Sequence, residues 1–293
     1  MDTATIVQLI ISGLAVGAVY ALVAEGFYIA FRITNTLNFG QGDFLMVGCF
    51  VTLLFIHMGL PFYLILALLL CVMAILGIIV ERIAIRPVAR AGLSFILTTM
   101  GFAMIMQNSV IALWGNTAKP FPSFFGGGRE KAIRIGGIGF FPEEVFIILV
   151  SLLVMILFLF LLHRTLIGKA FSAVSFNPDT ASLLGINVKR MKVFAYIIAS
   201  VLAGVSGFLI GPITTVEPFM GFKWTLKGFV AAILGGFLNP VGILVGGLML
   251  GLIENFASLF TSQYRDMISF MVIIAVLVFR PSGLFREQEV RPG

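Results

Sequence analysis

Long, unbroken apolar runs constrain the fold of this chain more than any other feature of its sequence. The segment 145–162, for example, carries no charge and a single polar residue, Ser151. Such a run is long enough to cross a hydrocarbon core of ~30 Å as a helix, whereas a membrane β-barrel would alternate polar and apolar residues over segments of ~10 residues. Because lipid offers no partner for backbone N–H and C=O groups, each crossing has to be helical. The sequence therefore predicts an all-α, polytopic transmembrane helix bundle.

The composition agrees with this class and excludes others. Only 11% of the residues are charged, against about 25% in soluble domains. The net charge of +6 comes from basic residues spread through short loops rather than gathered on one face, so we expect no nucleic-acid partner. Cys49 and Cys71 lie inside apolar runs, and His57 and His163 stand alone. We therefore expect neither a disulfide framework nor a metal site.

The apolar runs predict about eight or nine membrane segments in one transmembrane domain, 1–293. We place them at 7–31, 43–58, 62–83, 93–114, 143–163, 193–212, 225–238, 240–260 and 265–280. The first is expected to stay in the protein, because the N-terminus lacks the basic region of a cleaved signal. Most Lys and Arg fall in 32–42, 82–92, 164–192 and 281–293. The positive-inside rule then predicts a periplasmic N-terminus, a periplasmic loop at 115–142 and a cytoplasmic C-terminus.

An interruption is expected at 234–240, where glycines precede Asn239-Pro240. Proline removes a helical hydrogen bond and asparagine favours a turn. The segment is either a short or broken helix at membrane depth or an ordinary cytoplasmic turn. In the first case Gly235, Gly236 and Asn239 would line a translocation pathway.

The loop 164–192 is too polar to cross the membrane, yet it contains a helix signal. Asn177-Pro178-Asp179 predicts a helix start and Gly185 a helix stop. The apolar face of this short helix would comprise Ala181, Leu184 and Ile186. It could dock into a groove on a cytoplasmic partner or rest on the lipid surface.

Several polar residues fall inside or beside the predicted crossings. A carboxylate such as Glu25 costs ~2.5–3.5 kcal/mol in hydrocarbon, so it faces either a helix contact or a polar pathway. The stretch 35–43 combines two glycines with polar side chains at a predicted cytoplasmic helix junction. Its role is either that of a gate or that of a helix cap. For Gln107 and Asn108, we expect the side chains to reach the membrane interface. The candidate pathway residues in these stretches are Glu25, Asn35, Asn38, Gln41 and Asp43.

The chain also resembles a known family in many short motifs. They include 13–22 (GLAVGAVYAL), 38–44 (NFGQGDF), 98–101 (TTMG), 181–187 (ASLLGIN), 251–254 (GLIE) and 279–285 (FRPSGLF). With these motifs, nearly the whole chain is similar to the branched-chain amino-acid type of ABC transporter permease, which is related to the ribose-type permeases.

The resemblance implies a function and a set of partners. The chain would be the permease subunit of a binding-protein-dependent importer in the bacterial inner membrane, moving amino acids or related small polar solutes. It would pair with a second homologous permease subunit, two cytoplasmic ABC ATPase subunits and a periplasmic substrate-binding protein. The ATPase-coupling residues would be Asn177, Asp179, Ala181, Leu184, Gly185, Ile186 and Asn187.

No P-loop pattern occurs in the sequence, so ATP and Mg²⁺ would bind the partner subunits, and this chain would be no enzyme and bind no cofactor. The alternative is an ion-coupled secondary transporter or channel for a solute such as urea or amides, which can also use broken helices and buried carboxylates. An ion-driven carrier needs no docking helix at 164–192. The sequence leaves open the solute, the identity of the second permease, the role of Glu25 and the exact number of crossings.

Overall fold

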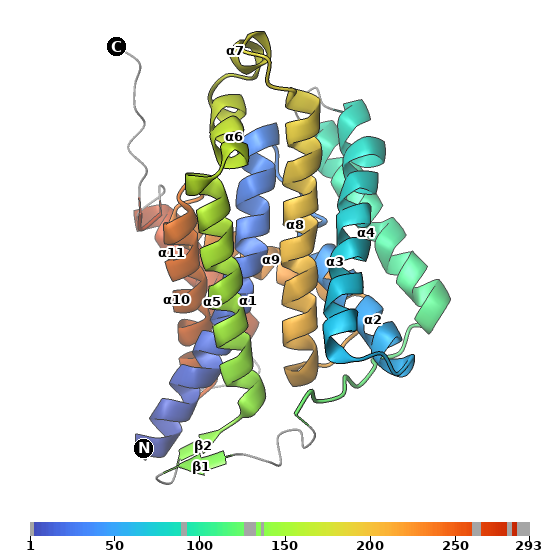
Figure 1. Ribbon diagram of the computed structural model, residues 1–293. Helices are drawn as coiled ribbons and strands as arrows, with labels where there is room; N and C mark the ends of the chain where they lie inside the picture. Colours follow the sequence, from blue (N-terminus) through green and yellow to red (C-terminus); the bar gives the residue numbers. More distant parts are fainter. Residues whose placement is uncertain are drawn as a thin grey trace.

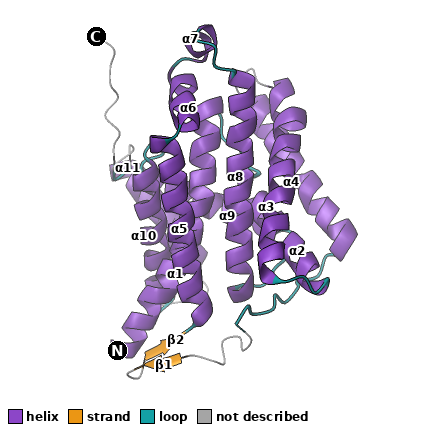
Figure 2. Ribbon diagram, viewed as in Figure 1, coloured by secondary structure: helices purple, strands orange, loops and turns teal. Residues whose placement is uncertain are grey.

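A helix bundle accounts for almost the whole computed structural model, which describes residues 3–88, 93–125, 133–135, 138–259, 265–279 and 283–285 (Figures 1 and 2). Parts of the loops predicted at 82–92, 115–142 and 281–293 lie outside these residues. The helices are α1 (Thr3–Thr34), α2 (Gln41–His57), α3 (Phe62–Val80), α4 (Leu93–Trp114), α5 (Pro142–Arg164), α6 (Leu166–Phe176), α7 (Pro178–Leu183), α8 (Val188–Ile210), α9 (Met220–Gly235), α10 (Pro240–Ala257) and α11 (Arg265–Phe279).

Helix α1 forms the centre of the bundle. It has 32 residues, so at 1.5 Å per residue it extends ~48 Å. Helices α5, α8, α9 and α10 pack around it. Its side chains from Ala15 to Ala30 are almost all buried. In the absence of a hydrophobic drive between helices in lipid, close packing of this kind has to hold the bundle together.

Glycines allow α1 and α10 to approach closely. A Cβ atom on Gly17 would lie 2.8 Å from the carbonyl oxygen of Gly247, and one on Gly13 would lie 3.1 Å from Leu252 Cα. Small residues at four-residue spacing are typical of such contacts between membrane helices. The repeated glycines of both segments are thus explained by one helix contact.

The predicted crossings coincide with helices, and the all-α class is confirmed. Six of the described helical runs are long and apolar enough to span a membrane. They are α1, α3 with its continuation η1 (Glu81–Ile85) and η2 (Arg86–Val88), α4, α5, α8 with η4 (Gly211–Ile213), and α10. Helices α2, α9 and α11 have 17, 16 and 15 residues, so the number of complete crossings stays a prediction.

Two small elements lie outside the predicted crossings. A short antiparallel hairpin pairs β1 (Ile133–Ile135) with β2 (Ile138–Phe140) beside the start of α1. Helix α6 continues the direction of α5 toward α7 at the opposite end (Figure 1). We refer to these two ends of the bundle as the N-terminal end and the α7 end.

Candidate functional site

Helix α7 begins and ends where the sequence predicts. The side chain of Asn177 accepts hydrogen bonds from the N–H groups of Asp179 and Thr180, both at 3.0 Å, and so caps the helix start. At the other end, Gly185 has φ +84°, a conformation that L side chains rarely adopt. The N–H groups of Gly185 and Ile186 bond back to Ser182 and Ala181, which forms a Schellman motif. Local hydrogen bonds therefore hold this one short helix.

The exposed apolar surface of α7 differs from the predicted face. Ala181 is only 2% exposed and Ile186 is partly buried, so both face the protein. Leu183 and Leu184 are 89% and 75% exposed. The prediction was therefore wrong for Ala181, and it missed Leu183. The projecting apolar surface of α7 itself is the pair Leu183 and Leu184, and Phe176 at the end of α6 is exposed beside it.

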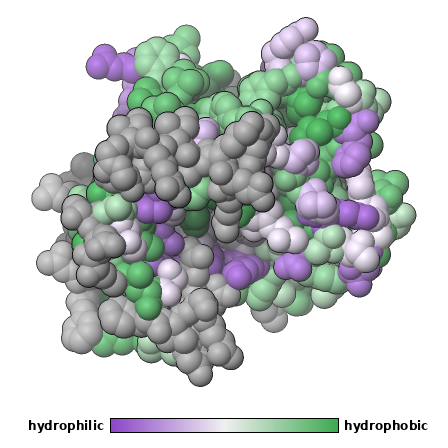
Figure 3. Space-filling model, turned by 90° about the horizontal axis from the view of Figure 1, so that it is seen from below, coloured by the Kyte–Doolittle hydropathy of each residue, from purple (hydrophilic) through white to green (hydrophobic). Residues whose placement is uncertain are grey.

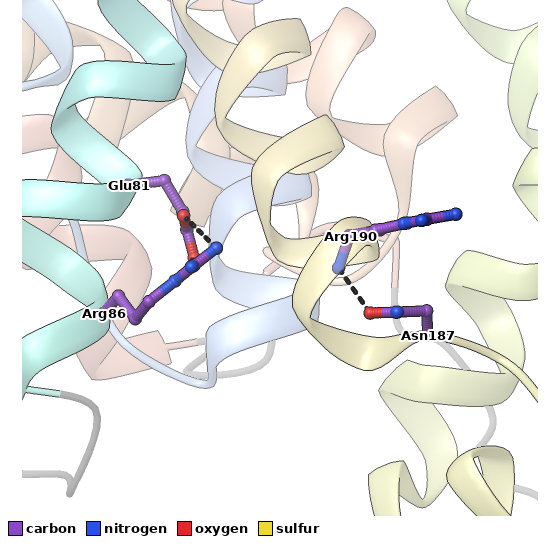
Figure 4. A network of polar contacts seen from close by, with 4 residues as sticks. All are labelled: Glu81, Arg86, Asn187 and Arg190. Carbon is purple, nitrogen blue, oxygen red and sulfur yellow. Dashed lines mark hydrogen bonds and ion pairs between the residues drawn. The ribbon is translucent and has the colours of Figure 1, made fainter.

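Two further polar contacts lie at the start of α8 and in η1, and Figure 4 shows both. The side chain of Asn187 accepts a hydrogen bond from the Arg190 N–H at 3.0 Å and so caps α8. On η1, which packs against α8, Glu81 is buried and pairs with Arg86 at 3.0 Å. The Asn187 cap fixes where α8 begins, and the Glu81–Arg86 pair joins η1 to η2.

The junction between α1 and α2 lies deep in the bundle, not at the α7 end as the sequence predicts. The Gln41 side chain donates a hydrogen bond to the carbonyl of Ala199, at 2.9 Å. Ala199 lies halfway along α8. Helix α2 thus begins near the middle of the bundle, and the non-helical residues 35–40 lead down to it. This interruption is of the kind that lipid tolerates only where protein or water covers it.

Two threonines bind the backbone of this interruption. The Thr225 hydroxyl accepts a hydrogen bond from the Gly42 N–H at 2.9 Å and contacts the Phe39 carbonyl oxygen at 3.3 Å. The Thr99 hydroxyl accepts from the Phe39 N–H at 3.3 Å. Side chains from α4 and α9 therefore replace the helical hydrogen bonds that residues 35–40 lack.

Asp43 is held at the same depth by contacts that the sequence did not predict. Gln107 donates a hydrogen bond to Asp43 Oδ1 at 2.8 Å. On the other side lies Gly221, where a Cβ would come within 2.3 Å of that oxygen. Gln107 thus points into the protein rather than to an interface, and that expectation was wrong. Asn108 bonds to the Met104 carbonyl of its own helix.

Three predicted pathway residues have buried polar atoms without a hydrogen-bond partner among the described residues. The atoms are Glu25 Oε2, Asn38 Nδ2 and Gln41 Oε1, and Glu25 is only 1% exposed. Leaving a buried polar atom without a partner costs about 1–3 kcal/mol. Such atoms call for a role beyond packing or for water in the bundle.

The remaining predicted pathway residues lie elsewhere: Gly235 ends α9, Gly236 and Asn239 lie in the turn between α9 and α10, and Asn35 lies near α1. The Asn239 N–H bonds to the Gly236 carbonyl at 2.9 Å, and its side chain caps α10. Phe237 in this turn stacks edge-on against Phe31 near the end of α1, at 4.9 Å between ring centroids. The structure has a turn here, preceded by the short helix α9 of 16 residues. Asn35, with φ 52°, lies in the loop that follows α1.

A polar cavity of about 430 Å³ at the N-terminal end was not predicted. It lies between α1, α5, α9 and α10 and contains a buried ion pair, Lys227 with Glu254. The Tyr20 hydroxyl donates to Glu254 Oε2 at 2.7 Å. Lys227 falls within the predicted crossing 225–238, and a cation inside a crossing was the signal that could have indicated this site. Among the described residues, no cluster of His, Cys, Asp and Glu could hold a metal ion.

The chain matches known proteins over nearly its whole length. Residues 9–277 match the family described as branched-chain amino acid transport system / permease component. The chain is 31% identical to the high-affinity branched-chain amino acid transport system permease protein BraD of Pseudomonas aeruginosa, and 30% identical to LivH of Escherichia coli, with 97% of this chain and 96% of each relative covered.

A more distant relative is the permease protein LivM of Salmonella typhimurium, 25% identical over 91% of this chain and 67% of that protein. No solved structure showed a significant match. The family match and the two permease relatives confirm the resemblance found in the sequence motifs. This chain belongs to the family of permease components of branched-chain amino acid transport systems.

Proposed function

We propose that this chain is one permease subunit of a binding-protein-dependent ABC importer that moves branched-chain or related amino acids across the bacterial inner membrane. Its N-terminal end faces the periplasm and its α7 end the cytoplasm. It works with a second homologous permease, two ATPase subunits that hold ATP and Mg²⁺, and a periplasmic binding protein. Relatives named LivH and LivM, both permease proteins of such systems, support a pair of related permeases.

The observation that carries this proposal is the projecting pair Leu183 and Leu184 on α7. Two leucines that are 89% and 75% exposed at the end of a capped helix form a small, rigid, apolar knob. Burying one leucine side chain in a partner contributes about 1.5–3 kcal/mol. Helix α7 packs against both α6 and α8. A movement of α7 is therefore transmitted to α8, the long helix that contacts α1, α2 and α3. We assign the coupling contact with an ATPase groove to this helix.

The translocation pathway in this proposal runs past Glu25, Asn38, Gln41 and Asp43. The unpartnered polar atoms of the first three support this assignment, since groups retained in hydrocarbon at a cost tend to face a polar path. We also assign to this pathway Gly235, Gly236 and Asn239 at the junction of α9 and α10, and Asn35 in the loop that follows α1.

The test replaces both leucines with aspartate, as Leu183→Asp/Leu184→Asp, in the assembled transporter. The double variant should insert normally but lose substrate-stimulated ATP hydrolysis, because two carboxylates cannot be buried unpaired in an apolar groove. The matched control is Leu166→Asp on α6, where the leucine is equally exposed at 82% but lies outside α7. Stimulation that survives in the double variant would refute the coupling role of α7.

A further inference from the structure

The cavity at the N-terminal end lies apart from the α1–α2 junction and has a mixed polar and apolar lining. Figure 3 looks onto this end of the molecule, where hydrophilic residues lie among hydrophobic ones. The volume of about 430 Å³ falls in the range of roughly 300–1,000 Å³ that is typical of small-molecule sites. Its apolar lining includes Val16, Met220 and Trp224.

The buried charges of the lining form two groups of contacts, and the exposed Glu217 and Lys223 also line the cavity. In the first group, Lys227 and Glu254 form an ion pair and are 4% and 1% exposed, with Tyr20 bonded to the carboxylate. In the second group, Glu144 accepts hydrogen bonds from Ser12 at 2.6 Å and from Gln8 at 2.9 Å. The first group comes from α1, α9 and α10, the second from α1 and α5.

Charged groups cost free energy when they are buried away from water. A buried ion pair contributes little or nothing to stability compared with apolar residues of the same volume. A second buried carboxylate beside the same cavity adds to the cost. Close packing through glycines already holds α9 against α10, where a Cβ on Gly246 would lie 2.5 Å from the Ala231 carbonyl oxygen, so the ion pair is not needed to join these helices. The ion pair is therefore better explained by a role in the cavity that it lines.

We propose that this cavity is a binding site for a zwitterionic amino acid with an apolar side chain. Lys227 would face the ligand carboxylate, Glu254 and Glu144 would face its ammonium group, and Val16, Met220 and Trp224 would contact its side chain. This inference rests on the proposed function and assigns a binding site for the transported solute within this one subunit.

The charge of the cavity selects the ligand class. A zwitterion brings one group of each sign, so it contacts both the buried cation and the carboxylates and leaves the net charge of the cavity unchanged. An anion or a cation of the same shape offers a partner to only one sign and changes that net charge. The site therefore discriminates by the presence of both charged groups, and its apolar lining favours an aliphatic side chain over a polar one.

Trp224 provides a direct readout of binding. The chain contains two tryptophans, and the other, Trp114, packs against Phe50 outside the cavity. In the full-length Trp114→Phe variant, purified in detergent micelles, leucine should change the Trp224 fluorescence saturably. Two analogues test the ligand class: 4-methylpentanoate lacks the ammonium group and isopentylamine lacks the carboxylate. Each should bind about tenfold more weakly or worse, as the loss of a charged hydrogen bond predicts.

Two cavity variants and one matched control test the assigned residues. Glu144→Gln should weaken leucine binding about tenfold. Glu143→Gln should leave it unchanged, because the neighbouring Glu143 is also buried but bonds Ser123 and lies outside the cavity lining. Lys227→Met/Glu254→Met removes both charges together and so avoids an unpaired charge that could prevent folding. It should abolish saturable binding with an unchanged circular dichroism spectrum.

The proposal is overturned by a flat leucine titration of the folded protein, by equal binding of 4-methylpentanoate, or by full leucine binding in the folded double variant. The same variants in the assembled transporter separate this site from the function. Amino-acid uptake at the parental rate with Lys227→Met/Glu254→Met would reject the site and leave the importer intact. An assembled parent that moves no amino acid would reject the proposed function, while the titration still decides the binding site.

Discussion

The Thr225 hydroxyl is the best single place to test the architecture of the α1–α2 junction. Replacing Thr225 by Val keeps the shape and removes the hydroxyl. The Gly42 N–H then loses its partner at 2.9 Å, and the Phe39 carbonyl loses a weaker one at 3.3 Å. Thr225 is fully buried, so water cannot readily take over these bonds.

The size of the effect follows from these contacts. One buried unsatisfied N–H costs about 1–3 kcal/mol. Hydrogen bonds between membrane helices measure lower, ~0.6 kcal/mol on average and up to ~1.7. We therefore expect Thr225→Val to lower the free energy of unfolding by about 1–2 kcal/mol, measured by denaturant titration in micelles with far-UV circular dichroism.

Thr52→Val is the matched control for this substitution. Thr52 is also fully buried, but its hydroxyl bonds only to the Gly48 carbonyl of its own helix, at 2.7 Å. Its loss should cost less than about 0.5 kcal/mol, since no backbone group loses a needed partner. Thr225→Ser retains the hydroxyl and should recover most of the stability. Equal stabilities of Thr225→Val and Thr52→Val would show that the threonine does not hold the junction.

Two further predictions concern orientation and the pathway. In a background without Cys49 and Cys71, single cysteines at the exposed positions Asn116 and Ser182 should label from opposite sides of the membrane with an impermeant thiol reagent; labelling from one side contradicts the topology. Glu25→Gln replaces a buried carboxyl group with an amide of the same shape, so uptake by the assembled transporter should fall while its assembly is maintained. Parental uptake per complex would make Glu25 a helix contact only.

Features that depend on neighbouring residues could be predicted from the sequence. The start and end of α7 follow from Asn177 and Gly185, because capping and positive φ are local properties. The helices likewise follow from apolar length. The exposed face of α7 could not be predicted, since a helix of six residues is too short to show a period.

Features that depend on distant partners could not be predicted. The sequence places Lys227 in the predicted crossing 225–238, and only the fold brings it and Tyr20 to Glu254. The depth of Gln41 depends in the same way on its contact with Ala199 in α8. Polar residues in an apolar chain indicate that a partner exists, but their sequence positions do not say which one.

The enclosure of α1 has a consequence for biogenesis. Among the described helices, α1 is synthesised before α10, its tightest neighbour, and α2 to α9 are made between them. Gly17 has no contact with Gly247, and the Leu9 carbonyl has no bond from the Asn255 side chain, until α10 has been made. Until then, the face of α1 that packs against α10 has to face lipid or an insertion factor. We expect the nascent chain to remain a loose set of inserted helices until 240–257 has entered the membrane, so that chains truncated before α10 become substrates for membrane proteases.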